Sequence, residues 1–106
     1  MNGTPSAVVT LILPRIISVT VTDDTVSVDL EDGRTIAVPI GWYPRLAHGT
    51  LTERANVQIS GAGYGMHWPE LDEDIGIEGL LMGKQSTEES AASFERWLQR
   101  RKARQP

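Results

Sequence analysis

The sequence of 106 residues contains no cysteine. A chain without cysteine forms no disulfide framework and has neither a thiol nucleophile nor a thiolate metal site, and it suits a reducing cytoplasm. Long apolar runs are also missing: the longest, residues 7–13, is far shorter than the roughly 20 residues that a membrane-spanning helix needs. No segment rich in lysine or arginine precedes it, so we expect no secretory signal. We therefore predict a cytoplasmic protein without a membrane segment.

Residues that commonly carry catalysis or bind cofactors are scarce. Histidine occurs only at His48 and His67, without the H-E-x-x-H spacing of a zinc site, and no serine stands in a nucleophile elbow. Glycines at positions 61, 63 and 65 resemble a phosphate-binding loop, but an extended segment follows where such a loop requires a helix. We therefore predict no metal and no cofactor. The best acid/base candidates are His67 with Asp72 or Asp74, and the alternative function is a small metal-dependent or acid/base enzyme that uses them.

The net charge of −4 is unevenly distributed along the chain. Residues 1–94 carry 13 acidic and 5 basic side chains, a net charge of −8, whereas residues 95–106 carry 5 basic and 1 acidic, a net charge of +4. An acidic body repels phosphate groups, so we do not expect the main domain to bind nucleic acid. The basic C-terminal segment leaves DNA binding through a terminal helix as a further alternative.

The pattern of the first third predicts an extension and then strands. In the N-terminal extension, residues 1–15, the apolar run of residues 7–13 is predicted to be an edge strand or a contact surface in a homo-oligomer. From residue 17 apolar and polar side chains alternate, with Ile17, Val19 and Val21 inward. Residues 26–30 and 35–38 repeat this pattern, and Asp32-Gly33 between them favours a type I′ hairpin turn. These segments predict an antiparallel meander of three strands.

Short helices are predicted to cover the apolar face of this meander. Pro44 suits the first turn of a helix that ends at Gly49, and Thr50 stands three residues before Glu53, the spacing of a capping box. Residues 57–60 and 66–68 predict a further hairpin, and residues 77–82 a short helix closed by Gly83. The predicted architecture is α+β, with the main domain at residues 16–83.

Residues 84–106 are predicted to be a linker and a basic amphipathic C-terminal helix. Ser86 or Thr87 would cap this helix, and cations gather in its last turn. Its apolar stripe consists of Ala91, Phe94, Trp97 and Leu98. We expect the helix to pack on the domain through Phe94 and Trp97.

Four blocks of the sequence resemble a single family. They are the hairpin at Asp32 to Arg34, the segment Trp42 to Leu46, the turn Thr50 to Arg54, and the stretch Gly65 to Leu81. In this order they resemble the small bacterial family called domain of unknown function 2442, with Met66 in place of an aliphatic residue and Gly76 in place of the usual serine. The resemblance implies a small α+β fold, a bacterial cytoplasm and a gene neighbourhood suggestive of toxin-antitoxin pairs. No activity comes with it.

The carboxylates of the stretch from Gly65 to Leu81 have more than one interpretation. Asp72 and Asp74 fit two positions of a calcium-binding loop, but Gly76 falls on its fifth position and the loop fails. We expect these aspartates to contact arginines at positions 34, 45 or 54 and to cap turns or helix ends. We also expect His67 to bond a carboxylate such as Asp72.

Aromatic and charged side chains near the ends of helices and strands are typical of protein interfaces. The predicted partner-binding surface consists of Trp42, Arg45, Trp68, Asp72, Glu73 and Asp74. We therefore predict a non-enzymatic bacterial protein-interaction module, with the antitoxin-like member of a two-gene pair as its specific form. Its partner would be another bacterial protein, encoded by an adjacent gene.

Overall fold

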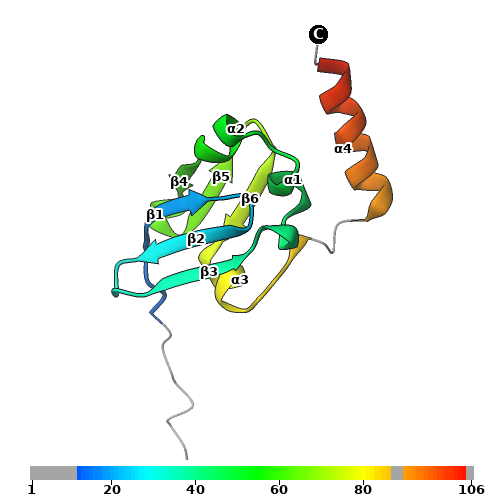
Figure 1. Ribbon diagram of the computed structural model, residues 1–106. Helices are drawn as coiled ribbons and strands as arrows, with labels where there is room; N and C mark the ends of the chain where they lie inside the picture. Colours follow the sequence, from blue (N-terminus) through cyan, green and yellow to red (C-terminus); the bar gives the residue numbers. More distant parts are fainter. Residues whose placement is uncertain (1–11, 87–89, 105–106) are drawn as a thin grey trace, which may run out of the picture.

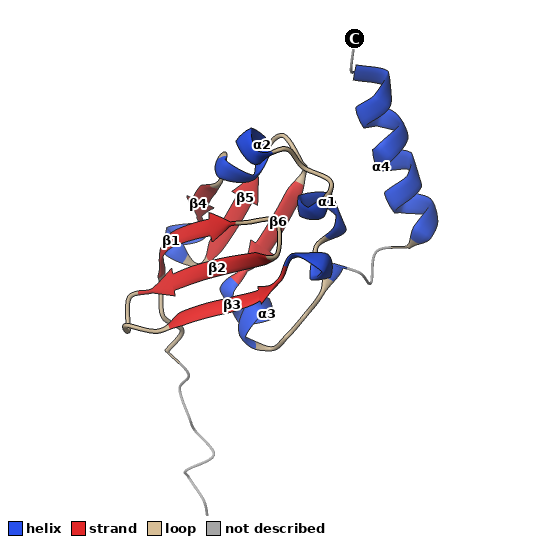
Figure 2. Cartoon of the chain, in the orientation of Figure 1, coloured by secondary structure: helices blue, strands red, loops and turns tan. Residues whose placement is uncertain are grey.

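The computed structural model describes residues 12–86 and 90–104 and has the predicted α+β fold (Figure 1, Figure 2). Two antiparallel sheets of three strands are joined by short helices, and a longer helix follows them. The strand or contact predicted at residues 7–13 lies outside the described residues except for Ile12 and Leu13, which are not in a strand. Within the described ranges, no helix combines the length and the apolar character that crossing a membrane requires.

The first sheet confirms the predicted meander. Its strands are β1 (Ile16–Val21), β2 (Thr25–Leu30) and β3 (Thr35–Pro39), in the order β1-β2-β3. The hairpin between β2 and β3 lies where it is predicted, but its turn is not of type I′. Within this fully described loop only Gly33 has a positive φ, +93°, and its N–H donates to the Leu30 carbonyl at 3.1 Å. The loop is therefore the three-residue kind, with glycine in the left-handed position.

At the N-terminal end of β1, the residue that faces the core differs from the predicted one. Between Ile16 and Ser18 the register with β2 shifts, because Ile17 is an extra residue on the bulged strand. The bulge turns Ile16 into the core and leaves Ile17 60% exposed. Val19 and Val21 still pack against the core, as predicted. The predicted inward position of Ile17 is wrong, because the strict alternation of inward and outward side chains along a strand is interrupted at a bulge.

Short helical segments connect the two sheets. They are a 3₁₀ turn, η2 (Ile40–Trp42), and the helices α1 (Pro44–Ala47) and α2 (Leu51–Ala55). The predicted capping box is confirmed: the Thr50 hydroxyl accepts from the Glu53 N–H at 3.1 Å, and the Glu53 carboxylate accepts from the Thr50 N–H at 2.9 Å. Buried Arg54 donates to the carbonyls of Leu46 and Ala47, both at 2.9 Å. Arg54 therefore ties α2 to the end of α1, where the Leu46 carbonyl also accepts from the Gly49 N–H at 3.0 Å.

The second sheet has one strand more than the predicted hairpin. It consists of β4 (Gln58–Ser60), β5 (Gly65–Trp68) and β6 (Glu73–Gly76), in that order, with a 3₁₀ turn, η3 (Gly61–Gly63), between β4 and β5. The sequence pattern missed β6 because it is short and half acidic, and acidic residues are depleted in strands. Its side chains nevertheless alternate, with Glu73 and Ile75 inward and Asp74 and Gly76 outward.

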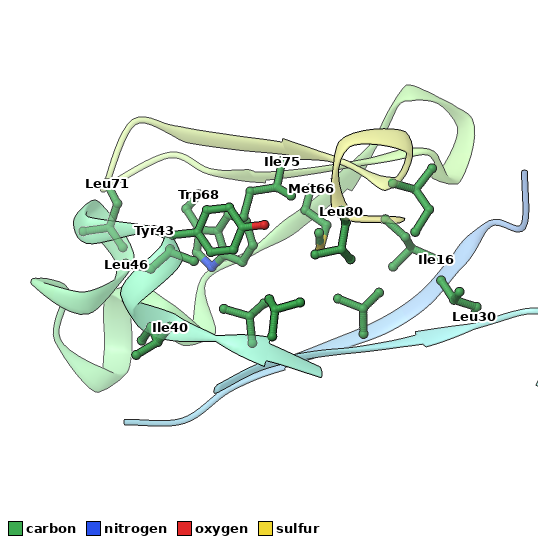
Figure 3. Packing of buried hydrophobic residues seen from close by; sticks show 14 of the residues in the cluster. Ile16, Leu30, Ile40, Tyr43, Leu46, Met66, Trp68, Leu71, Ile75 and Leu80 are labelled. Carbon is green, nitrogen blue, oxygen red and sulfur yellow. The ribbon is translucent and has the colours of Figure 1, made fainter. Parts of the chain in front are cut away.

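The core lies between the two sheets, as Figure 3 shows. Met66 and Trp68 of β5 and Ile75 of β6 face the buried side of the first sheet. Leu46 of α1 and Leu80 of α3 (Ile77–Leu81) lie toward opposite ends of this layer (Figure 3). Burying each of these side chains contributes about 1.5–3 kcal/mol. The apolar face of the meander is thus covered by the second sheet as well as by the predicted short helices.

Two helices end the described chain. Gly76 is the N-cap of α3, and Gly83, with φ +76°, follows the helix as predicted. The C-terminal helix α4 (Ala91–Arg104) begins later than predicted, because the Ser90 hydroxyl accepts from the Ser93 N–H at 3.1 Å and caps it. Of the two predicted caps, Ser86 precedes the helix by several residues and Thr87 lies outside the described residues.

Candidate functional site

The contact between α4 and the domain gathers aromatic and charged groups around Trp97. This side chain is 1% exposed, and its indole N–H donates to the Leu71 carbonyl at 3.1 Å. The guanidinium carbons of Arg45 and Arg101 lie 5.4 Å and 5.0 Å from the centroid of its ring, within the range of cation–π attraction. Phe94 stacks on the same ring at 5.6 Å between centroids. Phe94 and Trp97 therefore pack α4 on the domain, as predicted.

A bidentate ion pair holds α4 one helical turn after Trp97. Arg101 donates to the two carboxylate oxygens of Glu53, at 2.9 Å and 3.0 Å. Because Glu53 also belongs to the capping box of α2, its carboxylate is already positioned by Thr50. The hydrogen bonds from Arg101 hold the pKa of Glu53 below its ordinary value, against the opposing effect of burial and with further help from Thr50.

Arg45 links α4 to the turn between β5 and β6. This turn places Asp72 at φ +51°, a region that aspartate tolerates better than most residues. Arg45 Nη1 donates to the Asp72 carbonyl at 2.8 Å and to its carboxylate at 3.2 Å. The contact is one of those expected from the sequence, whereas Arg34 and Arg54 pair with Asp32 and Asp23 instead. His48 lies 5.3 Å from Phe94 between ring centroids. We call the set Arg45, His48, Glu53, Leu71 and Asp72 the helix-docking site.

The acid/base candidates His67 and Asp74 meet on the outer side of the second sheet. They are cross-strand partners of β5 and β6, and His67 Nδ1 lies 2.8 Å from Asp74 Oδ1. Their side chains are 34% and 75% exposed. The expected His67–Asp72 contact is wrong, because Asp72 lies in the turn and contacts Arg45. A pocket of about 230 Å³ borders Asp74 and is also lined by Tyr43 and Lys84.

Two members of the predicted partner-binding surface are buried. Trp68 is fully buried because it takes an inward position on β5, and its indole N–H donates to the Arg54 carbonyl at 3.0 Å. Glu73 is buried because it takes an inward position on β6. The expectation that Trp68 and Glu73 face a partner is therefore wrong for the folded domain. Of the other members, Trp42 and Arg45 are half-buried and the two aspartates are exposed.

The inward carboxylate of Glu73 affects a buried phenol. Burial raises the pKa of Tyr43, and the negative charge of Glu73 raises it further. Across the part of the chain that the structure describes, no three histidine, aspartate or glutamate side chains converge as metal ligands. Asp72 and Asp74, which fit two positions of a calcium loop, contact Arg45 and His67 respectively.

The roles of two charged residues in the docking contact were not predicted from the sequence. Arg101 is one of five cations in residues 95–106, and composition alone does not distinguish it from the others. Its position four residues after Trp97 places both on one helix face, and this is the signal that was available. Glu53 was expected only as a capping group.

The fold and the docking site define a small α+β domain of two facing sheets, with a C-terminal helix attached to its helices and to the turn between β5 and β6. Over residues 16–86 the chain matches the family described as "Protein of unknown function (DUF2442)", and it belongs to that family. The matched region ends before α4. The resemblance expected from the four sequence blocks is thus confirmed.

Two solved structures are similar to this chain. A protein of unknown function from Rhodospirillum rubrum is 35% identical, with a TM-score of 0.61, and the match covers 71% of this chain and 93% of that one. An uncharacterized protein from Chromobacterium violaceum is 23% identical, with a TM-score of 0.59 and coverage of 73% and 70%, which shows the fold alone. No curated protein matches the chain.

Proposed function

We propose that this protein is a non-enzymatic protein-interaction module that binds basic amphipathic helices. The observation that carries the proposal is the way in which the domain holds α4. Trp97 is anchored by the Leu71 carbonyl, and Arg101, on the same helix face, is bound by Glu53. Trp97 and Arg101 are four residues apart, and a helix that binds in a groove uses anchor residues at this spacing. The helix-docking site therefore already holds the kind of segment that a partner would offer.

The charge of the domain supports a basic partner. Residues 16–86 contain eleven acidic and four basic side chains, a net charge of −7. Three of the four cations, at positions 34, 45 and 54, form ion pairs with aspartates of the same domain. The charge left to act on other molecules is mainly acidic, and it attracts and orients a basic protein.

The specific form that we propose is the antitoxin-like member of a two-gene pair. The adjacent gene would encode the partner, and a helix of that partner would replace α4, because two helices cannot share the Leu71 carbonyl and the Glu53 carboxylate. Expression of both genes, with a tag on this chain, should yield a stoichiometric complex by gel filtration. Recovery of this chain alone while the neighbour is present in soluble form would argue against the pair.

A peptide titration tests the helix-docking site without knowledge of the partner. A labelled peptide of residues 90–104 is added to the full-length chain and to its Trp97→Ala variant, in which the resident helix has lost its anchor. We expect the variant to bind the peptide at least about tenfold more tightly, because α4 competes at high effective concentration in the unchanged chain. No binding to a Trp97→Ala chain that circular dichroism shows to be folded would contradict the proposal.

Two charge reversals separate a specific site from general attraction. Glu53→Lys and Glu31→Lys change the net charge equally, but Glu53 contacts Arg101 whereas Glu31 lies in the loop between β2 and β3. In the Trp97→Ala background, Glu53→Lys should abolish peptide binding and Glu31→Lys should leave it nearly unchanged. Equal losses in the two variants would mean that only overall charge attracts the peptide.

A second candidate is a small acid/base or metal-dependent enzyme, favoured by the His67–Asp74 contact of 2.8 Å beside a pocket of about 230 Å³. A panel of divalent cations in thermal unfolding tests the metal-dependent form. A ligand at one hundred times its dissociation constant adds about 2.7 kcal/mol of stability. A cation shift that disappears in Asp74→Asn would support this candidate, and the absence of a shift would remove its metal-dependent form.

A third candidate, DNA binding, rests on α4. Arg96, Arg100 and Arg104 are exposed and follow one another at intervals of four residues, so they form one row on the helix. Binding through this row predicts an affinity for duplex DNA that falls steeply with salt. The affinity should vanish when residues 100–106 are deleted, and a weak, salt-independent signal would count against it.

A further inference from the structure

The end of the domain that carries α3 lies away from α2 (Figure 1) and has several exposed apolar residues. Ile12, Leu81 and Met82 are 85%, 36% and 69% exposed. Together with Leu13 and Pro14 they line a pocket of about 410 Å³. Single exposed apolar residues are ordinary on protein surfaces, but a group of them around one concavity marks a site of interaction.

Both walls of this pocket are attached to the core. Ile77 and Leu80 of α3 are buried, which holds the following residue, Leu81, at the surface. Gly83 has a φ of +76° and ends the helix there, so Met82 remains at its tip. Pro14, which also lines the pocket, is buried as well. A pocket with walls fixed in this way needs little ordering when a ligand binds.

Two opposite charges flank the apolar centre. Arg34, from the hairpin between β2 and β3, and Glu78, from the first turn of α3, both line the pocket. The Arg34 side chain is 58% exposed although its Nε contacts Asp32 at 2.9 Å. In a two-fold symmetric contact the same patch faces itself, and a patch with one charge of each sign allows Arg34 of one copy to face Glu78 of the other.

We propose that this pocket is the interface between two copies of the chain. Leu81 and Met82 of one copy enter the pocket beside Ile12 and Leu13 of the other, and two Arg34–Glu78 ion pairs flank the apolar contact. An apolar centre with one charge of each sign complements itself when two copies face each other. The proposal stands independently of the function proposed above.

Sedimentation of the full-length chain over a dilution series tests the interface. We expect a dimer that dissociates on dilution. Met82→Glu should raise the dissociation constant roughly 30-fold or more, as for a central interface residue. Leu51→Glu is the matched control, because Leu51 is 71% exposed against 69% for Met82 but lies on α2. A monomer at every concentration, or equal losses in the two variants, would overturn the proposal.

Charge reversals test the symmetry of the contact. Glu78→Arg or Arg34→Glu alone would place like charges opposite each other twice, so each should weaken the dimer. The double variant restores opposite charges in exchanged positions and should recover most of the affinity, with circular dichroism confirming that all variants are folded. If the double variant is as weak as the two single ones, the two-fold pairing of Arg34 with Glu78 is wrong.

Discussion

Two tryptophans of this chain are buried to the same degree and make the same hydrogen bond in different parts of the molecule. Trp68 is 0% exposed and Trp97 1%, and their indole N–H groups donate to backbone carbonyls at 3.0 Å and 3.1 Å. Trp68 lies between the two sheets, inside the region that defines the family. Trp97 lies on α4, beyond that region. Equal burial therefore serves two purposes, completion of a core and attachment of an added helix.

The largest expected effect comes from the core tryptophan. Trp68→Ala removes a side chain enclosed by both sheets and leaves the Arg54 carbonyl without its donor. We expect a loss of about 3–5 kcal/mol of unfolding free energy, of the order seen for large-to-small changes in cores. Because domains of this size have only about 5–15 kcal/mol in all, the variant should be partly unfolded at modest temperature. Urea unfolding followed by circular dichroism measures the loss, and an unchanged midpoint would contradict it.

Trp97→Ala should cost less, although the side chain is equally buried. We expect α4 to detach while the two-sheet core stays folded, so the loss should not exceed the free energy of docking. We expect the amide protons of α4 to lose hydrogen-exchange protection while those of β2 and β5 keep theirs. Lys102→Ala, at an exposed position of the same helix, is the control and should preserve protection of α4. Simultaneous loss of protection in α4 and in the strands would mean that helix and core form one cooperative unit.

A pair of glycines tests how closely the docking turn approaches α1. A Cβ added at Gly49 would lie 2.8 Å from Leu71 Cδ1 and 3.2 Å from the Leu46 carbonyl oxygen, whereas one added at Gly41 meets nothing within 4 Å. Gly49→Ala should therefore push Leu71 and the turn that anchors Trp97, at a cost of about 1–3 kcal/mol. Gly41→Ala should stay within about 0.5 kcal/mol of the original stability. Thermal unfolding compares the two, and equal midpoints would refute the close approach.

The elements that could be predicted from the sequence are those with strong local signals. The meander follows from alternation, and α2 follows from the Thr50–Glu53 capping box. Local signals do not report the bulge at Ile17, because the register shift depends on pairing with β2. They also missed β6, whose acidic residues are tolerated because Asp74 faces outward and Glu73 accepts hydrogen bonds from Asp74 N–H and the Ser86 hydroxyl.

The candidate site was predictable only as a set of charged groups expected to meet. The sequence places Arg45 and Asp72 among charged groups expected to meet, and the structure joins them. Which face of β5 carries Trp68 depends on the sheet that packs against it, so the sequence did not reveal its burial. The choice of Arg101 among several cations depends on where α4 docks. Tertiary packing therefore determines both the burial of Trp68 and the role of Arg101.

The smallest expected effect concerns the ion pair between α4 and α2. Hydrogen bonds from Arg101 lower the pKa of Glu53 in the folded protein from a reference of 4.5. A carboxyl group with a lowered folded pKa stabilises the fold above its unfolded pKa, and this contribution is lost as pH falls through the folded value. The difference in melting temperature between the unchanged chain and Glu53→Gln should therefore be present at neutral pH and disappear well below pH 4.5. The effect is small because the glutamine oxygen still accepts from Arg101.

Repeating this comparison in an Arg101→Gln background identifies the source of the pH dependence. Without the guanidinium, the main cause of the lowered Glu53 pKa is gone, while the capping bonds to Thr50 remain. The difference between glutamate and glutamine at position 53 should then vary much less with pH. If it varies as strongly as before, the capping box rather than α4 controls Glu53, and the ion pair contributes little to the attachment of the added helix.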